Sequence, residues 1–157
     1  ASAYTGLGEA YQKMDMLPQA EQALLEAVRL APLDVRPELH LADVYFEERK
    51  FDLAEERYQA SIRALPSLRG YFGLGITEWE RHKPANAERA FKMANALDSR
   101  DARAYFMLGL VYSATGRKAE AIREYEAGLR MDPKNRIALN AIAKLGVQTS
   151  SAGRPQP

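Results

Sequence analysis

The sequence contains no cysteine, only two histidines and a single tryptophan. The absence of cysteine excludes disulfide bonds, thiolate metal sites and cysteine nucleophiles. The two histidines, His40 and His82, are too few for a histidine-rich metal site, so we expect neither a metal nor a cofactor. Apolar runs are only a few residues long, whereas a membrane-spanning helix needs roughly 20 residues, so we expect no insertion into a membrane.

Charge of one sign is not in excess either, because 22 lysine and arginine residues face 21 aspartate and glutamate residues, for a formal net charge of +1. Nucleic-acid-binding proteins usually show a clear basic excess, so we do not expect nucleic acid as a partner. No targeting signal is visible at the first residues, and a chain without cysteine is compatible with the cytoplasm and the periplasm alike. The sequence therefore leaves the localisation open.

One pattern recurs four times along the chain. Four similar stretches begin with alanine, 34, 33 and 34 residues apart, at Ala20, Ala54, Ala87 and Ala121. A second block precedes each stretch by 16 residues and contains Leu7–Gly8, Leu41–Ala42, Leu74–Gly75 and Leu108–Gly109 in turn. Because the two blocks keep their spacing in every copy, the one missing residue falls between Pro66 and Tyr71. Connections between elements tolerate deletions, so this position supports the alignment.

Each copy predicts two helices and no strand. Apolar residues recur in both blocks at spacings of three and four, as they do on one face of a helix. Pro18 and Pro84 lie near the starts of second helices, where a missing N–H costs little, and Pro32, Pro66 and Pro133 end them. No segment alternates apolar and polar residues with a period of two. The sequence therefore predicts an all-α fold.

These residues resemble the tetratricopeptide repeat (TPR) family, whose 34-residue helix–turn–helix pattern carries Leu-Gly, aromatic, alanine and proline residues at fixed positions. The fourth copy matches well, with Leu108, Gly109 and Tyr112. The third copy departs from the pattern, because Glu78 replaces a tyrosine and Ser99 replaces the proline. The resemblance implies an α-solenoid, a right-handed superhelix of antiparallel helix pairs whose first helices line the concave side.

The predicted TPR domain covers residues 1–147. Its repeats are 1–34, 35–67, 68–101 and 102–135, followed by a capping helix at 136–146. Apolar residues on one side of that helix are expected to shield the end of the fourth repeat, as solenoids require: Ile137, Leu139, Ile142 and Leu145. The remaining residues, 148–157, are polar and rich in proline and glycine, so we predict a disordered tail.

The resemblance also implies a binding surface, because family members usually bind ligands through positions two, five, nine and twelve of each first helix. We call these positions the inner stripe. In the first copy they are polar: Ser2, Thr5, Glu9 and Gln12. In the other copies they include three arginines and an apolar, aromatic floor, a composition typical of binding hot spots and of exposed binding patches. The predicted partner-binding residues are Arg36, Leu39, Asp43, Phe46, Arg69, Phe72, Ile76, Trp79, Arg103, Phe106 and Leu110.

The sequence favours a non-enzymatic protein–protein interaction scaffold. Carboxylates such as Glu47, Glu48, Glu55 and Glu56 fall on helical charge runs, which usually face solvent, and no enclosed acid–base pair is indicated. We expect a protein or peptide partner with apolar or aromatic side chains, and with acidic groups that pair with the arginines. Two alternatives stay open. One is a scaffold of a bacterial exopolysaccharide synthesis or secretion system, in contact with polysaccharide or its assembly proteins; the other is a structural spacer or self-association module.

Overall fold

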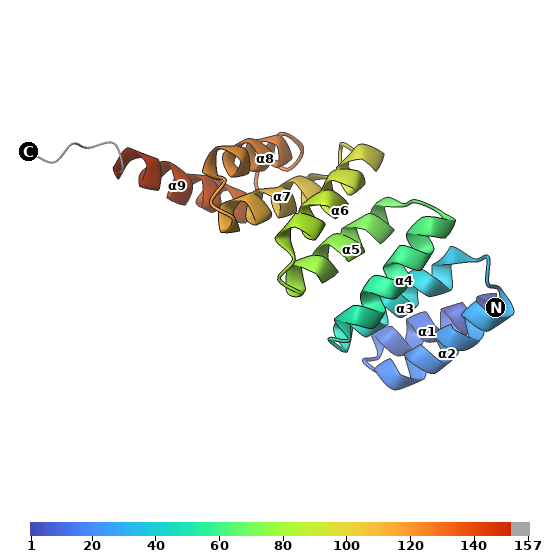
Figure 1. The fold of residues 1–157 in the computed structure, drawn as a ribbon. Helices are drawn as coiled ribbons and strands as arrows, with labels where there is room; N and C mark the ends of the chain where they lie inside the picture. The colour runs from blue at the N-terminus through green and yellow to red at the C-terminus, as the bar shows by residue number, and fades with distance from the viewer. Residues whose placement is uncertain (152–157) are drawn as a thin grey trace, which may run out of the picture. The chain divides into compact units, whose positions relative to one another are not determined.

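The computed structural model describes residues 1–151, with side chains described as far as residue 146 (Figure 1). This part of the chain forms nine helices and no strand, so the predicted all-α class is confirmed. The helices are α1 (Ser2–Lys13), α2 (Leu17–Leu30), α3 (Val35–Glu47), α4 (Phe51–Ala64), α5 (Leu68–Glu80), α6 (Pro84–Leu97), α7 (Ala102–Ala114), α8 (Lys118–Met131) and α9 (Arg136–Ser151). One antiparallel pair of helices falls within each of the four predicted repeats.

The chain divides into two compact units, Ala1–Ala94 and Asn95–Pro157. Unit one contains the pairs α1/α2 and α3/α4, together with α5 and most of α6. Its first helices contact one another in sequence, α1 with α3 and α3 with α5, and form one layer. Unit two contains the pair α7/α8 and the helix α9, which packs on α8.

The turn inside each helix pair has the same geometry in all four copies. A residue with positive φ follows each first helix: Asp15 (59°), Arg49 (59°), His82 (58°) and Gly116 (78°). The next backbone N–H then reaches back to a carbonyl five residues earlier, as Lys50 N does to Tyr45 O at 2.8 Å and Arg117 N to Tyr112 O at 2.8 Å. This hydrogen bond ends the first helix in a left-handed cap. Only the fourth copy has glycine at this position, so it is the only copy whose sequence indicates the cap.

The core of unit one lies where paired helices approach closely. A buried cluster joins α2, α3 and α4 and contains Ala20, Leu24, Leu39, Leu41, Ala42, Val44, Tyr45, Ala54 and Tyr58. In the third pair, Gly75 allows α5 to approach the fully buried ring of Phe91, because a Cβ atom at Gly75 would lie 2.6 Å from Phe91 Cε1. Small residues at these positions therefore set the distance between the helices of a pair.

Helix α9 differs from the predicted capping helix in two respects. It extends to Ser151, five residues beyond the predicted end at 146, so residues 148–151 of the predicted tail are helical. The rest of that tail, 152–157, lies outside the described residues. Ala138 and Leu145 are buried, whereas Ile137 is 80% and Leu139 47% exposed. The prediction that all four apolar residues shield the fourth repeat is therefore wrong for Ile137 and Leu139.

Candidate partner-binding surface

Side-chain caps hold two of the three stripe arginines. Asp34 and Asp101 begin α3 and α7 by accepting hydrogen bonds from the backbone N–H groups of Arg36 (3.0 Å) and Arg103 (2.9 Å). Each carboxylate also binds the guanidinium of the same arginine, with Nη2–Oδ2 distances of 2.6 and 2.5 Å. The hydrogen bond from the guanidinium holds the pKa of both aspartates below the usual range. These arginines were predicted to pair with a partner's acidic groups, and the structure places a carboxylate of their own helix cap on each.

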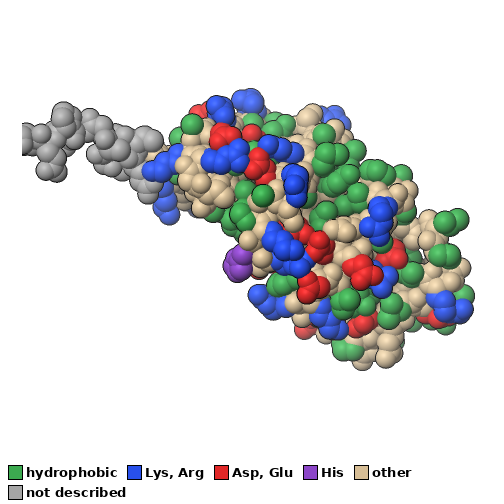
Figure 2. All heavy atoms as spheres, viewed as in Figure 1, with side chains coloured by type: hydrophobic (Ala, Val, Ile, Leu, Met, Phe, Trp, Pro, Cys, Tyr) green, Lys and Arg blue, Asp and Glu red, His purple; other side chains and the backbone are tan. Residues whose placement is uncertain are grey.

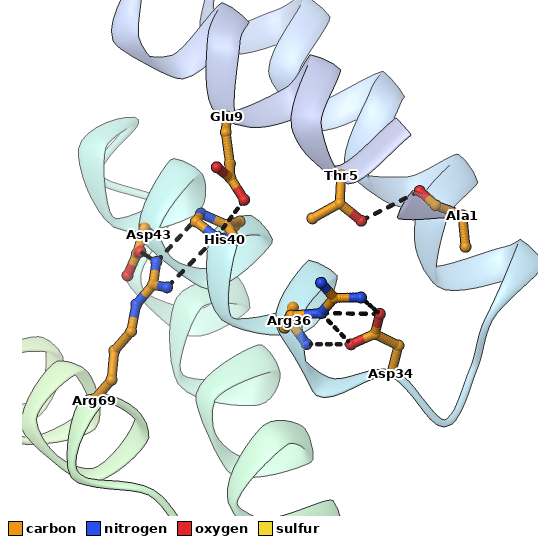
Figure 3. A network of polar contacts seen from close by, with 8 residues as sticks. All are labelled: Ala1, Thr5, Glu9, Asp34, Arg36, His40, Asp43 and Arg69. Atoms are coloured by element: carbon orange, nitrogen blue, oxygen red, sulfur yellow. Dashed lines mark hydrogen bonds and ion pairs between the residues drawn. The ribbon is translucent and has the colours of Figure 1, made fainter. Parts of the chain in front are cut away.

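Arg69 binds differently, because its helix begins at a serine. Ser67 Oγ accepts the capping hydrogen bond from Gly70 N at 3.1 Å and offers no charge to an arginine. The Arg69 guanidinium instead reaches from α5 to α3, where it donates to Asp43 and lies 3.2 Å from His40 Nδ1 (Figure 3). The arginines beside an aspartate cap thus bind that cap, and the arginine beside a serine cap binds the preceding first helix.

A polar network joins the three first helices of unit one. Figure 3 shows His40 of α3 between Glu9 of α1 and Arg69 of α5. His40 Nε2 lies 3.0 Å from Glu9 Oε1, and burial, with Arg69 nearby, lowers the pKa of the imidazole. A neutral ring suits both neighbours, because Nδ1 can then accept from Arg69 while Nε2–H donates to Glu9.

Tyr58 extends the network from a second helix. Its hydroxyl donates to Asp43, the carboxylate that also binds Arg69. Tyr58 is only 4% exposed, and burial, followed by the negative charge of Asp43, raises the pKa of its phenol. Asp43, predicted as a partner-binding residue, therefore has its carboxylate engaged by two side chains of its own unit.

The apolar part of the inner stripe is only partly accessible in unit one. Leu39 is 7% exposed and belongs to the core cluster of α2, α3 and α4. Its predicted role as an open contact is therefore wrong, because its side chain packs inside that cluster. Phe46 is half-buried and packs on the same cluster, and its ring centroid lies 5.5 Å from that of Phe51. Phe72 is half-buried and meets the Phe91 ring in an edge-to-face arrangement, with 5.6 Å between the ring centroids. These two rings thus contribute to the core and also present part of their surface.

Two further apolar residues of the stripe lie toward the end of α5. Ile76 and Trp79 are both half-buried, one turn apart on the same helix. Together with Phe46 and Phe72 they form what we call the α3–α5 apolar patch. Its partial exposure leaves ring and methyl surface available for contact.

Unit two carries its own section of the stripe on α7. Arg103 pairs with Asp101 and its side chain is exposed, Phe106 is half-buried and Leu110 is 39% exposed. The Phe106 ring lies against α8, because a Cβ atom at Gly128 would stand 2.4 Å from Phe106 Cε1. Leu110 is therefore the large apolar residue of α7 that is exposed.

The sequence analysis missed the contribution of His40 and Tyr58 to this surface. His40 occupies position six of its repeat, next to the stripe, and Tyr58 occupies a second-helix position where an aromatic residue normally fills the core. No spacing rule marks either of them. The contacts of His40 arise between helices of different repeats, and that of Tyr58 arises between the two helices of one repeat.

Two family models match the chain. A model described as the cilia and flagella-associated protein 70 C-terminal domain matches residues 36–154, and a tetratricopeptide repeat model matches residues 1–32. The chain belongs to the tetratricopeptide repeat family. More specifically, most of it belongs to the family of that C-terminal domain.

A curated relative and two solved TPR-like structures resemble the chain. Human cilia- and flagella-associated protein 70 is 31% identical over 117 residues, which is 74% of this chain but 10% of that protein, so the chain spans about a tenth of this relative. The crystal structure of MamA has a TM-score of 0.85 and 25% identity over 92% of this chain and 79% of its own. YrrB, described as a TPR protein with an unusual peptide-binding site, has a TM-score of 0.80 and 18% identity over 94% and 76%.

These matches show that the chain has the α-solenoid fold of TPR proteins, the fold of protein-interaction scaffolds. Over the described part of the chain, no helix combines the length and the apolar character that crossing a bilayer requires.

Proposed function

We propose that this TPR domain is a non-enzymatic scaffold that binds a protein segment along the inner stripe of its first helices. The observation that carries the proposal is the incomplete burial of the stripe: the four members of the α3–α5 apolar patch are half-buried and Leu110 is 39% exposed. Partly exposed apolar and aromatic side chains are typical of binding sites, and each unit carries its own set of them. The peptide-binding site named for YrrB agrees with this proposal.

The internal ion pairs change the expected chemistry of the partner. Arg36 and Arg103 already bind the aspartates that cap their helices, and Arg69 binds Asp43. A partner's carboxylate must therefore compete with a carboxylate of the chain. This competition reduces the binding free energy that the partner's carboxylate contributes. We infer that apolar and aromatic side chains of the partner supply most of the affinity, and that its acidic groups set orientation at the exposed guanidinium groups.

Trp79 provides a direct test, because it is the single tryptophan of the chain and lies in the α3–α5 apolar patch. Amphipathic helical peptides and anionic oligosaccharides are titrated separately while the Trp79 emission is recorded. The proposal predicts a saturable change with peptides and none with oligosaccharides. A response to the oligosaccharides alone would replace this proposal with the polysaccharide alternative, and no response to either would refute a binding role for the patch.

A matched pair of leucines tests the α7 section of the stripe. Leu110 and Leu53 are 39% and 38% exposed, but Leu53 lies on the second helix α4 and does not belong to the inner stripe. Replacing Leu110 by alanine should weaken binding of a peptide that binds the wild-type protein, whereas Leu53→Ala should leave the affinity unchanged. Circular dichroism of both variants checks that the fold is retained. Equal losses from the two variants would contradict the assignment of Leu110.

The relatives suggest a setting for this function. Their name associates them with cilia and flagella, and the matching family model is the C-terminal domain of such a protein. We therefore propose that the bound segment belongs to a ciliary or flagellar protein. A fluorescent fusion of the chain, expressed in ciliated cells, should concentrate in the cilium, and Trp79→Ala should reduce that concentration. A uniform distribution of the wild-type fusion would count against this setting.

A further inference from the structure

The joint between the first two repeats contains a tyrosine bound to a carboxylate. Tyr45 of α3 is 4% exposed, and its hydroxyl donates to Glu21 Oε1 of α2 at 3.0 Å. Lys50 Nζ lies 3.3 Å from the other oxygen of Glu21. The phenol ring thus fills the space between a second helix and the next helix pair, and its hydroxyl is satisfied by a carboxylate of the preceding repeat.

The next joint repeats this arrangement but lacks the tyrosine. Glu55 of α4 occupies the position of Glu21, and Lys83, 3.9 Å from Glu55 Oε2, occupies the position of Lys50. Arg81 also binds Glu55. The position of Tyr45 is taken by Glu78, which is 2% exposed and accepts a hydrogen bond from Asn86 Nδ2 at 3.0 Å. Figure 2 shows the acidic and basic side chains gathered where α4 and α5 meet.

A pocket is present at this joint in unit one. It measures about 200 Å³ and lies between α4, α5 and α6, with Glu55 and Glu78 as its acidic side and Tyr71, Leu74, Ala90 and Met93 among its apolar walls. Sites for drug-sized ligands begin at about 300 Å³. A protein cavity of about 150 Å³ holds benzene, so the pocket has room for one ring.

We propose that this pocket binds a phenol ring, the side chain of a partner's tyrosine. The ring occupies the space that Tyr45 fills in the preceding joint, against Leu74 and Met93. Its hydroxyl donates to Glu55, as that of Tyr45 does to Glu21. The pocket is formed by different side chains from the inner stripe, so the proposal is independent of the one above.

The carboxylate of Glu55 makes the pocket selective for a ring with a donor. Ionised carboxylates only accept hydrogen bonds, and a hydrogen bond to a charged group contributes more than one between neutral groups. Glu78 is buried and already bound by Asn86, so the partly exposed Glu55 is the carboxylate that the ligand meets. An unsubstituted ring would cover Glu55 and offer it no hydrogen bond in place of solvent. The phenol hydroxyl compensates for this loss, whereas a phenyl ether cannot donate.

The test uses p-cresol as the probe and 4-methylanisole, which lacks the donor, as its matched ligand. Binding is followed through the methyl NMR signals of methionine, since Met93 lines the pocket. We expect p-cresol to shift one methionine signal saturably and 4-methylanisole to bind at least about tenfold more weakly. Glu55→Gln should reduce the preference of the pocket for p-cresol.

Two substitutions of the same kind on α5 complete the design. Glu78→Tyr fills the pocket with a ring of the chain itself and should abolish p-cresol binding. Glu80→Tyr, at an exposed position two residues along the helix, should leave the binding unchanged. Equal affinities for the two ligands, absence of p-cresol binding to the wild-type chain, or binding retained by a folded Glu78→Tyr variant would each overturn the proposal. If Glu78→Tyr does not fold, the Glu55→Gln comparison decides.

Discussion

Packing of the third helix pair requires a glycine at position 75, and substitution by alanine tests this requirement. A Cβ atom there would lie 2.6, 2.7 and 2.9 Å from three ring atoms of Phe91. Phe91 is 0% exposed and its ring centroid lies 5.6 Å from that of Phe72 in an edge-to-face arrangement, so the ring cannot move aside without disturbing a second ring. Overpacking of this kind typically costs ~1–3 kcal/mol.

Gly6 provides the matched control, because it also lies inside a first helix but has no atom within 4 Å of an added Cβ. Alanine in a helix interior is favoured over glycine by ~1 kcal/mol, so Gly6→Ala should stabilise the chain. Gly75→Ala gains the same stabilisation of the helix backbone but also introduces the steric clash with Phe91. The difference between the two variants should therefore be ~1–3 kcal/mol in the free energy of unfolding, with Gly75→Ala the less stable.

Urea unfolding monitored by far-UV circular dichroism measures both variants. The midpoints should move in opposite directions or, at the smallest clash, only that of Gly6→Ala should rise. The slopes of the transitions must stay equal for the comparison to report stability. An equal rise of both midpoints would show that α5 and α6 have room to separate, and the argument from close approach would then be refuted.

Three further outcomes follow from single contacts. The pKa of His40 in the folded chain lies below the unfolded value of about 6.5. The contribution of His40 to the free energy of unfolding is therefore complete above about pH 6.5 and is lost as the pH falls. His40→Gln, with Glu9 and Arg69 retained, should flatten this part of the pH–stability curve. Leu108 is 2% exposed, so Leu108→Ala should lower the free energy of unfolding by ~2–5 kcal/mol, as measured by urea unfolding. A loss of less than ~1 kcal/mol would contradict the burial of Leu108. Asp34→Ala removes the cap of α3 and should cost ~0.5–2 kcal/mol in the same assay, whereas an unchanged midpoint would mean that the cap contributes nothing.

The helices and their ends follow from local features of the sequence. The spacing of apolar residues places each pair, and Pro32, Pro66 and Pro133 end second helices because proline lacks the N–H that the next turn needs. Gly116 indicates one left-handed cap. The other three caps carry Asp15, Arg49 and His82, residue types that adopt positive φ far less readily than glycine, so only the structure reveals that all four turns are alike.

The stripe positions could be predicted, but not the availability of their side chains. Leu39 and Leu110 occupy the same stripe and are both leucine, yet one belongs to the core and the other is 39% exposed. Burial depends on which side chains the neighbouring helices bring to the contact, and a single helix does not contain that information. The same limit applies to Tyr58, which reaches the first helices from α4.

The sequence by itself determined the repeat, the all-α class and the family, because these depend on spacing along one chain and recur in four copies. Only the tertiary structure decided the partners of the charged groups and the shape of the joints. Arg69 binds Asp43 of the preceding first helix, whereas Ser67 caps its own, and a pocket lies beside Glu78 at the position that Tyr45 occupies in the preceding repeat. Both depend on distances between side chains of different repeats, which are set when the helix pairs stack.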